Sequence, residues 1–102
     1  MAVKKAKRHY EPWSLKEAKE FIDHFLDGVK VRDYKVVIDQ YAKKVDRTFD
    51  AVSFRQKEVI SILTDGEQGL KSDKWTKEFI QAINDKLNEG STSKNKMIML
   101  FE

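Results

Sequence analysis

Two helical periods separated by a short break, over residues 34–63, constrain this chain more than any other feature. In the first period, Tyr34 to Val45, apolar residues recur at steps of three and four, the spacing of one helix face; they are Val37, Ile38, Tyr41, Ala42 and Val45. Asp46 and Arg47 interrupt the pattern, and Thr48 can cap the next helix because its hydroxyl accepts from a free amide. The second period, Phe49 to Leu63, aligns Val52, Gln56, Val59, Ile60 and Leu63. This pattern predicts a helix-turn-helix unit.

A further helix is expected before this unit. Ser14 and Glu17 fit a capping box directly after Pro12. Gly28 is expected to end this helix in a left-handed conformation, and Asp33 to cap the helix that follows. The side chains assigned to the core are Trp13, Phe21, Phe25, Ile38, Tyr41, Val52 and Val59.

The sequence after Leu63 predicts a loop, a fourth helix and a short apolar tail. The helix is expected from Ser72 or Asp73 to about Asn88, with an apolar face of Trp75, Phe79, Ile80, Ile83 and Leu87. The run Met97 to Phe101 has no clear period and fits a strand or an extended plug. A wide apolar face does not stay in water. It either folds back on the first three helices, which we favour, or pairs with a second copy of the chain.

Composition limits the class of protein. The chain has 102 residues, 40% of them hydrophobic and 36% charged, which favours one small helical domain. With the helical periods described above, the expected fold is all-α: a three-helix helix-turn-helix bundle with an added C-terminal fourth helix and a short apolar tail. It has no cysteine, so neither disulfides nor thiolate metal sites are expected. No apolar run could span a bilayer or serve as a signal peptide. We therefore expect no membrane partner and a cytoplasmic location, nucleoid-associated if the protein is bacterial.

The net charge of +3 is distributed unevenly. Residues 1–12 carry Lys4, Lys5, Lys7 and Arg8 against Glu11, whereas residues 13–63 and 64–102 are each close to neutral. We interpret residues 1–12 as a flexible basic arm able to contact nucleic acid; a solvated tail without function is the alternative. Strong nucleic-acid binders usually carry more charge than the body of this chain.

Several short motifs lie in a recognisable order: Trp13-Ser14 with Glu17 and Phe21, then Tyr41-Ala42, Arg47-Thr48, Ala51-Val52 and Arg55. Over Trp13 to Ile60 the chain resembles the Myb/SANT-like branch of homeodomain-like helix-turn-helix proteins, especially short bacterial and phage versions. Two positions depart from the family pattern, because Ile38 and Gln56 stand where it has its second and third tryptophans. The resemblance implies three helices over residues 13–63 with the third as the DNA reader. Some SANT-like relatives bind proteins instead.

The outward face of the third helix is the candidate reading surface. Ser53 and Lys57 can donate to base edges or phosphates. Asp50 could accept from cytosine but would repel phosphates. Phe54 could touch a thymine methyl group or lie under the fourth helix or the tail, and we favour the covered position.

Arg47 and Thr48 open the third helix. Arg47 is either a phosphate clamp or the partner of a first-helix acid such as Glu17 or Glu20; Arg55 is expected to brace the core edge or contact the DNA backbone. The full set of candidate DNA-binding residues is Lys4, Lys5, Lys7, Arg8, Arg47, Thr48, Asp50, Ser53, Phe54 and Lys57.

No group of residues predicts catalysis. His9 and His24 are isolated, and there is no nucleophile beside a base and no phosphate-binding glycine loop, so we expect no enzyme, metal or cofactor. The leading hypothesis is a sequence-reading DNA-binding protein, a transcriptional regulator or phage accessory DNA binder, with its third helix in the major groove of double-stranded DNA. The alternatives are a SANT-like protein–protein interaction module, such as a phage protein docking on host machinery, and a DNA-packaging subunit. A homodimer through the C-terminal helix would present two reading helices.

Overall fold

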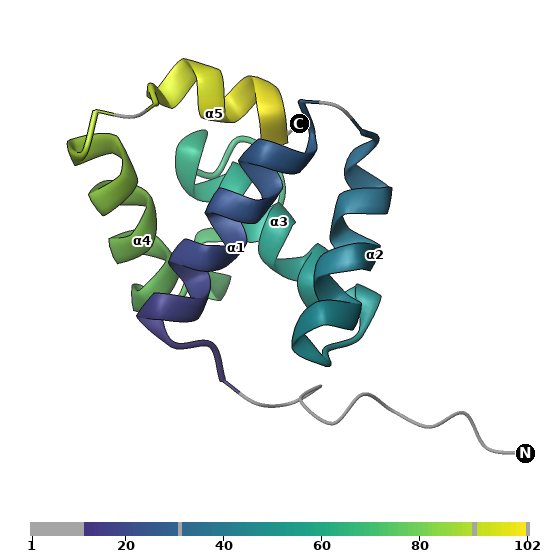
Figure 1. Ribbon diagram of the computed structural model, residues 1–102. Helices are drawn as coiled ribbons and strands as arrows, with labels where there is room; N and C mark the ends of the chain where they lie inside the picture. The colour runs from purple at the N-terminus through teal and green to yellow at the C-terminus, as the bar shows by residue number, and fades with distance from the viewer. Residues whose placement is uncertain (1–11, 31, 91, 102) are drawn as a thin grey trace, which may run out of the picture.

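The structure is a computed structural model that describes residues 12–30, 32–90 and 92–101. Its helices are α1 (Leu15–Gly28), α2 (Tyr34–Val45), α3 (Phe49–Leu63), α4 (Lys77–Asn88) and α5 (Lys94–Phe101), with a short 3-10 turn, η1 (Ser72–Lys74). Helix α1 lies at the centre, with α2 and α4 on either side, α3 behind it and α5 across one end (Figure 1). The described residues form no strand, so the predicted all-α class is confirmed. No described helix is long and apolar enough to cross a membrane.

The starts of the first three helices follow from their capping residues. The Ser14 hydroxyl accepts from the Glu17 amide at 3.1 Å, the Asp33 carboxylate from the Lys35 amide at 2.8 Å, and the Thr48 hydroxyl from the Ala51 amide at 3.1 Å. All three predicted caps are confirmed. Three residues, 46–48, join α2 to α3, and the first of them, Asp46, turns the chain with a φ of 58°.

Gly28 does not have the role expected of it. It is the last residue of α1, and the residue that caps the helix, Val29, is right-handed, so the predicted left-handed glycine is wrong. A Cβ atom on Gly28 would lie 2.8 Å from both methyl groups of Val37. The glycine is needed because α2 approaches α1 closely here, and any side chain would push the two helices apart.

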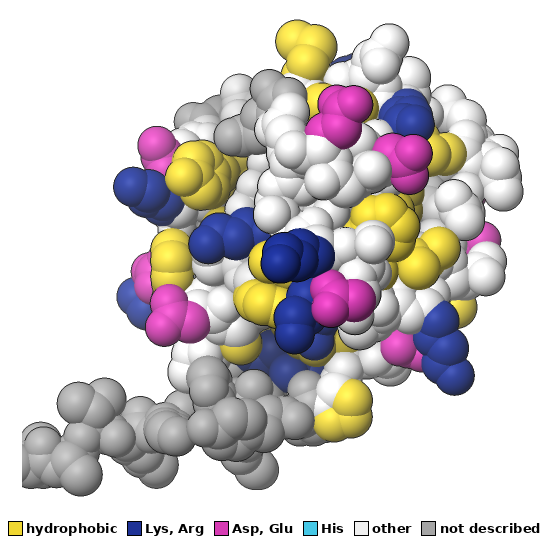
Figure 2. Space-filling view, turned by 180° about the vertical axis from the view of Figure 1, so that it is seen from behind, with side chains coloured by type: hydrophobic (Ala, Val, Ile, Leu, Met, Phe, Trp, Pro, Cys, Tyr) yellow, Lys and Arg dark blue, Asp and Glu magenta, His cyan; other side chains and the backbone are white. Residues whose placement is uncertain are grey.

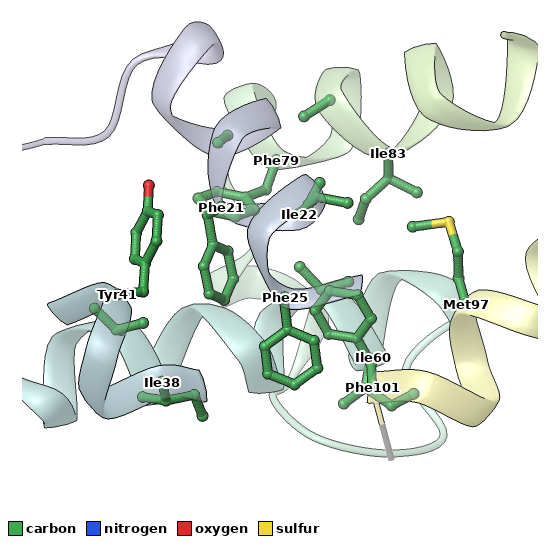
Figure 3. Packing of buried hydrophobic residues seen from close by; sticks show 14 of the residues in the cluster. Phe21, Ile22, Phe25, Ile38, Tyr41, Ile60, Phe79, Ile83, Met97 and Phe101 are labelled. Carbon is green, nitrogen blue, oxygen red and sulfur yellow. The ribbon is translucent and has the colours of Figure 1, made fainter. Parts of the chain in front are cut away.

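The core is built around the aromatic side chains of α1 (Figure 3). The Phe21 ring lies 5.3 Å from Tyr41 of α2 and 6.2 Å from Phe79 of α4, and the Phe25 ring stacks on Phe101 of α5 at 4.3 Å. All seven residues assigned to the core from the sequence are buried. Burying each such side chain stabilises the fold by about 1.5–3 kcal/mol.

The C-terminal segment packs into this same core within one chain. Helix α4 lies on α1, and α5 lies on α3 and α1, so the buried hydrophobic residues form one cluster. The segment therefore folds back, which is the first of the two arrangements considered above.

Two expectations for the C-terminal segment are corrected. Helix α4 begins at Lys77, not at Ser72 or Asp73, because contacts with α3 hold Trp75 and Thr76 in an extended conformation. The apolar tail is neither a strand nor a plug. It belongs to α5, where Met97 and Phe101 lie one turn apart and are both buried.

Candidate nucleic-acid interface

The N-terminal half of α3 carries the surface predicted to read DNA. Asp50, Phe54 and Lys57 are exposed and Ser53 is half-buried, while the inward positions Val52 and Val59 are fully buried. The four polar or aromatic side chains follow one stripe of the helix at steps of three and four. The structure therefore brings them together on one face.

Phe54 is not covered, contrary to the position favoured from the sequence. It is 40% exposed, and the guanidinium carbon of Arg55 lies 5.4 Å from its ring centroid. Helix α4 reaches α3 at Arg55, whose guanidinium carbon lies 5.6 Å from the Phe79 ring centroid, and α5 reaches it at Gln56, which donates to the Phe101 carbonyl. The outward stripe is thus left open, and with Phe49, 38% exposed, it displays two aromatic side chains to solvent.

Arg47 lies inside the protein. Its side chain is fully buried; the Nε and Nη2 atoms donate to the two carboxylate oxygens of Glu17, each at 3.0 Å, and Nη2 also donates to the Pro12 carbonyl at 3.3 Å. The guanidinium carbon lies 4.3 Å from the centroid of the Trp13 ring. The expectation of a phosphate clamp is therefore corrected to its alternative, an ion pair with a first-helix acid.

This ion pair fixes how α3 begins. Glu17 sits in the first turn of α1, and Arg47 in the connection between α2 and α3, so the bidentate contact ties the connection to α1. Thr48, the next residue, uses its hydroxyl to cap α3 and is half-buried. Both residues therefore hold the candidate surface in place from beneath rather than forming its outer face.

A second buried group holds the other side of α3, and the sequence analysis did not identify it. The fully buried Glu58 carboxylate accepts from Arg55 at 2.6 Å and from the amide and hydroxyl of Thr76 at 2.6 and 2.9 Å. The only sequence signal was the three-residue spacing of Arg55 and Glu58, which suits a helical ion pair. Arg55 thus braces the core edge, the first of its two expected roles.

The C-terminal half of α3 is closed off from solvent by the loop that follows it. The Ser61 hydroxyl donates to the Leu70 carbonyl and accepts from the Trp75 indole at 2.8 Å. Residues 58–61 are all buried. The exposed residues of α3 therefore end at Lys57.

The charge around α3 is mixed. Lys43 and Lys44 are exposed in the last turn of α2, but Lys43 pairs with Asp39 at 3.0 Å. The face in Figure 2 likewise shows basic, acidic and apolar side chains, with a small group of basic side chains near its middle that is bordered by an acidic one. The predicted arm contacts, Lys4, Lys5, Lys7 and Arg8, lie outside the described residues.

Among the described residues, no three His, Cys, Asp or Glu side chains are grouped so that they could hold a metal ion. His24 packs against Tyr41, with 5.1 Å between ring centroids, and burial lowers its pKa below the ordinary value, helped by the nearby charges of Lys44 and Arg32.

The chain matches no family model, no curated protein and no solved structure.

Proposed function

We propose that the chain is a small DNA-binding protein of the helix-turn-helix type, without enzymatic activity, that places the N-terminal half of α3 in the major groove. The observation that carries this proposal is the open stripe of Asp50, Ser53, Phe54 and Lys57, braced from both sides by buried ion pairs. Recognition helices of this type read bases with their N-terminal residues, which are the part of α3 that remains accessible here.

The chemistry of the stripe suits base contacts better than phosphate contacts. Lys57 and Ser53 can donate to guanine or phosphate oxygens, and Phe54 can pack against a thymine methyl group. Asp50 accepts from cytosine only where no phosphate is close. The surrounding lysines, Lys43 and Lys44, supply the cations that a DNA backbone needs, and the basic residues of 1–12 would add to them.

The test is an NMR titration of the full chain with duplex DNA at two salt concentrations. We expect the largest shifts at Asp50, Ser53, Phe54 and Lys57, and in residues 4–9. Lys57→Gln should either relax base preference or reduce the salt slope by about 0.9, the contribution of one neutralised phosphate. The matched control is Lys94→Gln, an exposed lysine of α5, which should bind as the unchanged chain does. Shifts confined to α4, or no binding at low salt, would overturn the proposal.

The two exposed phenylalanines favour a second candidate, a SANT-like module that docks on a protein. Phe49 and Phe54 are 38% and 40% exposed on the same half of α3, and aromatic side chains are common anchors of protein interfaces. In this case Phe54→Ser would abolish retention of a protein partner, whereas Met99→Ser, which changes a 76% exposed residue of α5, would not. Duplex DNA would then leave the α3 resonances unchanged.

A further inference from the structure

A small cavity of about 160 Å³ lies where α1, α4 and the segment around α5 meet, and α3 contributes no residue to it. Its apolar lining is Leu26 of α1 and Leu100 of α5. The remaining lining side chains are charged or carry a hydroxyl group. The cavity is therefore separate from the surface proposed above to contact DNA.

Three lysines line this cavity against two aspartates, and both aspartates already have cationic partners. Lys86 contacts Asp23 at 2.6 Å, and Lys30 lies 3.9 Å from Asp27. The third lysine, Lys96, forms no ion pair with any residue in the described part of the chain. Lys86 also lies 3.6 Å from Glu89, so the lysines of the cavity face three carboxylates in all, and the exposed Lys96 is the one among them without a carboxylate contact.

A second donor at the cavity also lacks an acceptor. The Thr92 hydroxyl oxygen is buried from solvent and has no hydrogen-bond partner among the residues described. A buried hydroxyl without a partner costs stability, so such groups are uncommon unless something else binds them. Thr92 and Lys96 are four residues apart and both line the cavity, which places an unsatisfied hydroxyl and an unpaired ammonium group around the same space.

We propose that this cavity binds a small oxyanion of the phosphate type, either free phosphate or the terminal phosphate of a nucleotide. Thr92 and Lys96 donate to its oxygens. Lys86 adds a third contact. Its ammonium group has three N–H donors, and only two of them face carboxylates, those of Asp23 at 2.6 Å and Glu89 at 3.6 Å. The cavity has room for a phosphate, since its volume is several times the roughly 30 Å³ that one water molecule occupies in the liquid. The nucleoside of a nucleotide would remain outside.

The experiment is an NMR titration of the full chain with inorganic phosphate, against sodium chloride at equal ionic strength. We expect saturable amide shifts at Thr92 and Lys96 with phosphate alone. Lys96→Gln should weaken binding by about tenfold or more, the loss of one charged hydrogen bond. Lys94→Gln, the matched control on the same helix but outside the cavity, should change the affinity by less than about twofold. Equal losses from both variants, or shifts that depend on ionic strength alone, would overturn the proposal.

A parallel titration with adenosine monophosphate distinguishes the two sources of the anion. Tighter binding than inorganic phosphate identifies a nucleotide, and equal or weaker binding identifies free phosphate.

A second variant tests the hydroxyl group separately. Thr92→Val keeps the shape of the side chain and removes the donor, so we expect weaker phosphate binding without a lower Tm of the phosphate-free protein. A clear fall in Tm without phosphate would mean that the hydroxyl has a structural partner, and the proposal would be wrong. Neither result depends on DNA binding, since Thr92 lies outside α3.

Discussion

Replacing Glu17 by glutamine should destabilise the whole domain while leaving the outward face of α3 chemically unchanged. The Arg47 side chain is fully buried and that of Glu17 is only 10% exposed, so the variant removes the negative charge that accepts two hydrogen bonds from this buried guanidinium. Removing one partner of a buried ion pair costs roughly 3–5 kcal/mol. Total domain stabilities are roughly 5–15 kcal/mol, so this single change removes a large share.

Thermal denaturation measures this loss directly. At roughly 4 °C per kcal/mol for a domain of this size, the Tm should fall by at least about 12 °C. The Tm of Arg47→Met should fall by a similar amount, because the buried Glu17 carboxylate loses the guanidinium that donates to both of its oxygens. The double variant Glu17→Gln/Arg47→Met removes both charges, so its loss should be smaller than the sum of the two single losses, with a coupling energy of about 0.5–3 kcal/mol. Lys43→Met, at a side chain that is 78% exposed, is the control and should change the Tm by no more than about 2 °C.

The opposite pattern would refute this reasoning. If Arg47→Met kept its Tm but reduced the salt slope of DNA binding by about 0.9, the arginine would contact a phosphate in solution. The buried ion pair with α1 would then not describe the working protein.

Three further predictions follow from local geometry. Gly69→Ala should lower the free energy of unfolding by at least about 1 kcal/mol more than Gly66→Ala, as measured by chemical denaturation. Both glycines have a positive φ, but a Cβ at Gly69 would lie 2.3 Å from the Lys57 carbonyl oxygen, whereas nothing lies within 4 Å of a Cβ at Gly66. Equal losses would contradict this. A chain ending at Gly66 loses the core side chains of α4 and α5, so we expect no cooperative melting by circular dichroism, and a heat-stable monomer in sedimentation would contradict it. Burial, and secondly the charge of Lys44, lowers the pKa of His24, so the folded state binds this proton more weakly than the unfolded state. Stability should therefore fall as the pH drops through 6.5 towards the pKa of the folded state. His24→Gln should remove that fall, and a pH profile unchanged by the substitution would refute the prediction.

Local signals were sufficient for the first three helices. Ser14, Asp33 and Thr48 each cap a helix through their own side chain, and capping depends only on residues within one turn. The apolar period likewise identified the inward face of α3. Such features are predictable from sequence because they need no knowledge of the rest of the fold.

Contacts between distant residues account for what the sequence did not predict. The start of α4 depends on Glu58, which binds Thr76 from 18 positions away, and the need for glycine at position 28 depends on the nearness of Val37. The run Met97 to Phe101 is too short to show a helical period. Its helix depends instead on packing against distant residues, such as the stacking of Phe101 on Phe25.

The candidate site was predicted only in part, for the same reason. The stripe of Asp50, Ser53, Phe54 and Lys57 follows from the helical period alone. The burial of Arg47 does not, because both of its expected roles fit the same position in the chain. Whether the Arg47 side chain is buried depends on the positions of Glu17 and Trp13 beside it, and these positions are set by how α1 packs.

The division of α3 into a braced interior and an open stripe has a consequence for how relatives of this protein could diverge. Ser53 and Lys57 belong to neither of the two buried ion pairs, so most substitutions at these two positions should be nearly neutral for folding. Mutations can therefore accumulate at these positions without being removed by selection for stability. The same scaffold could thus acquire a new binding preference through single mutations, whichever partner the stripe meets.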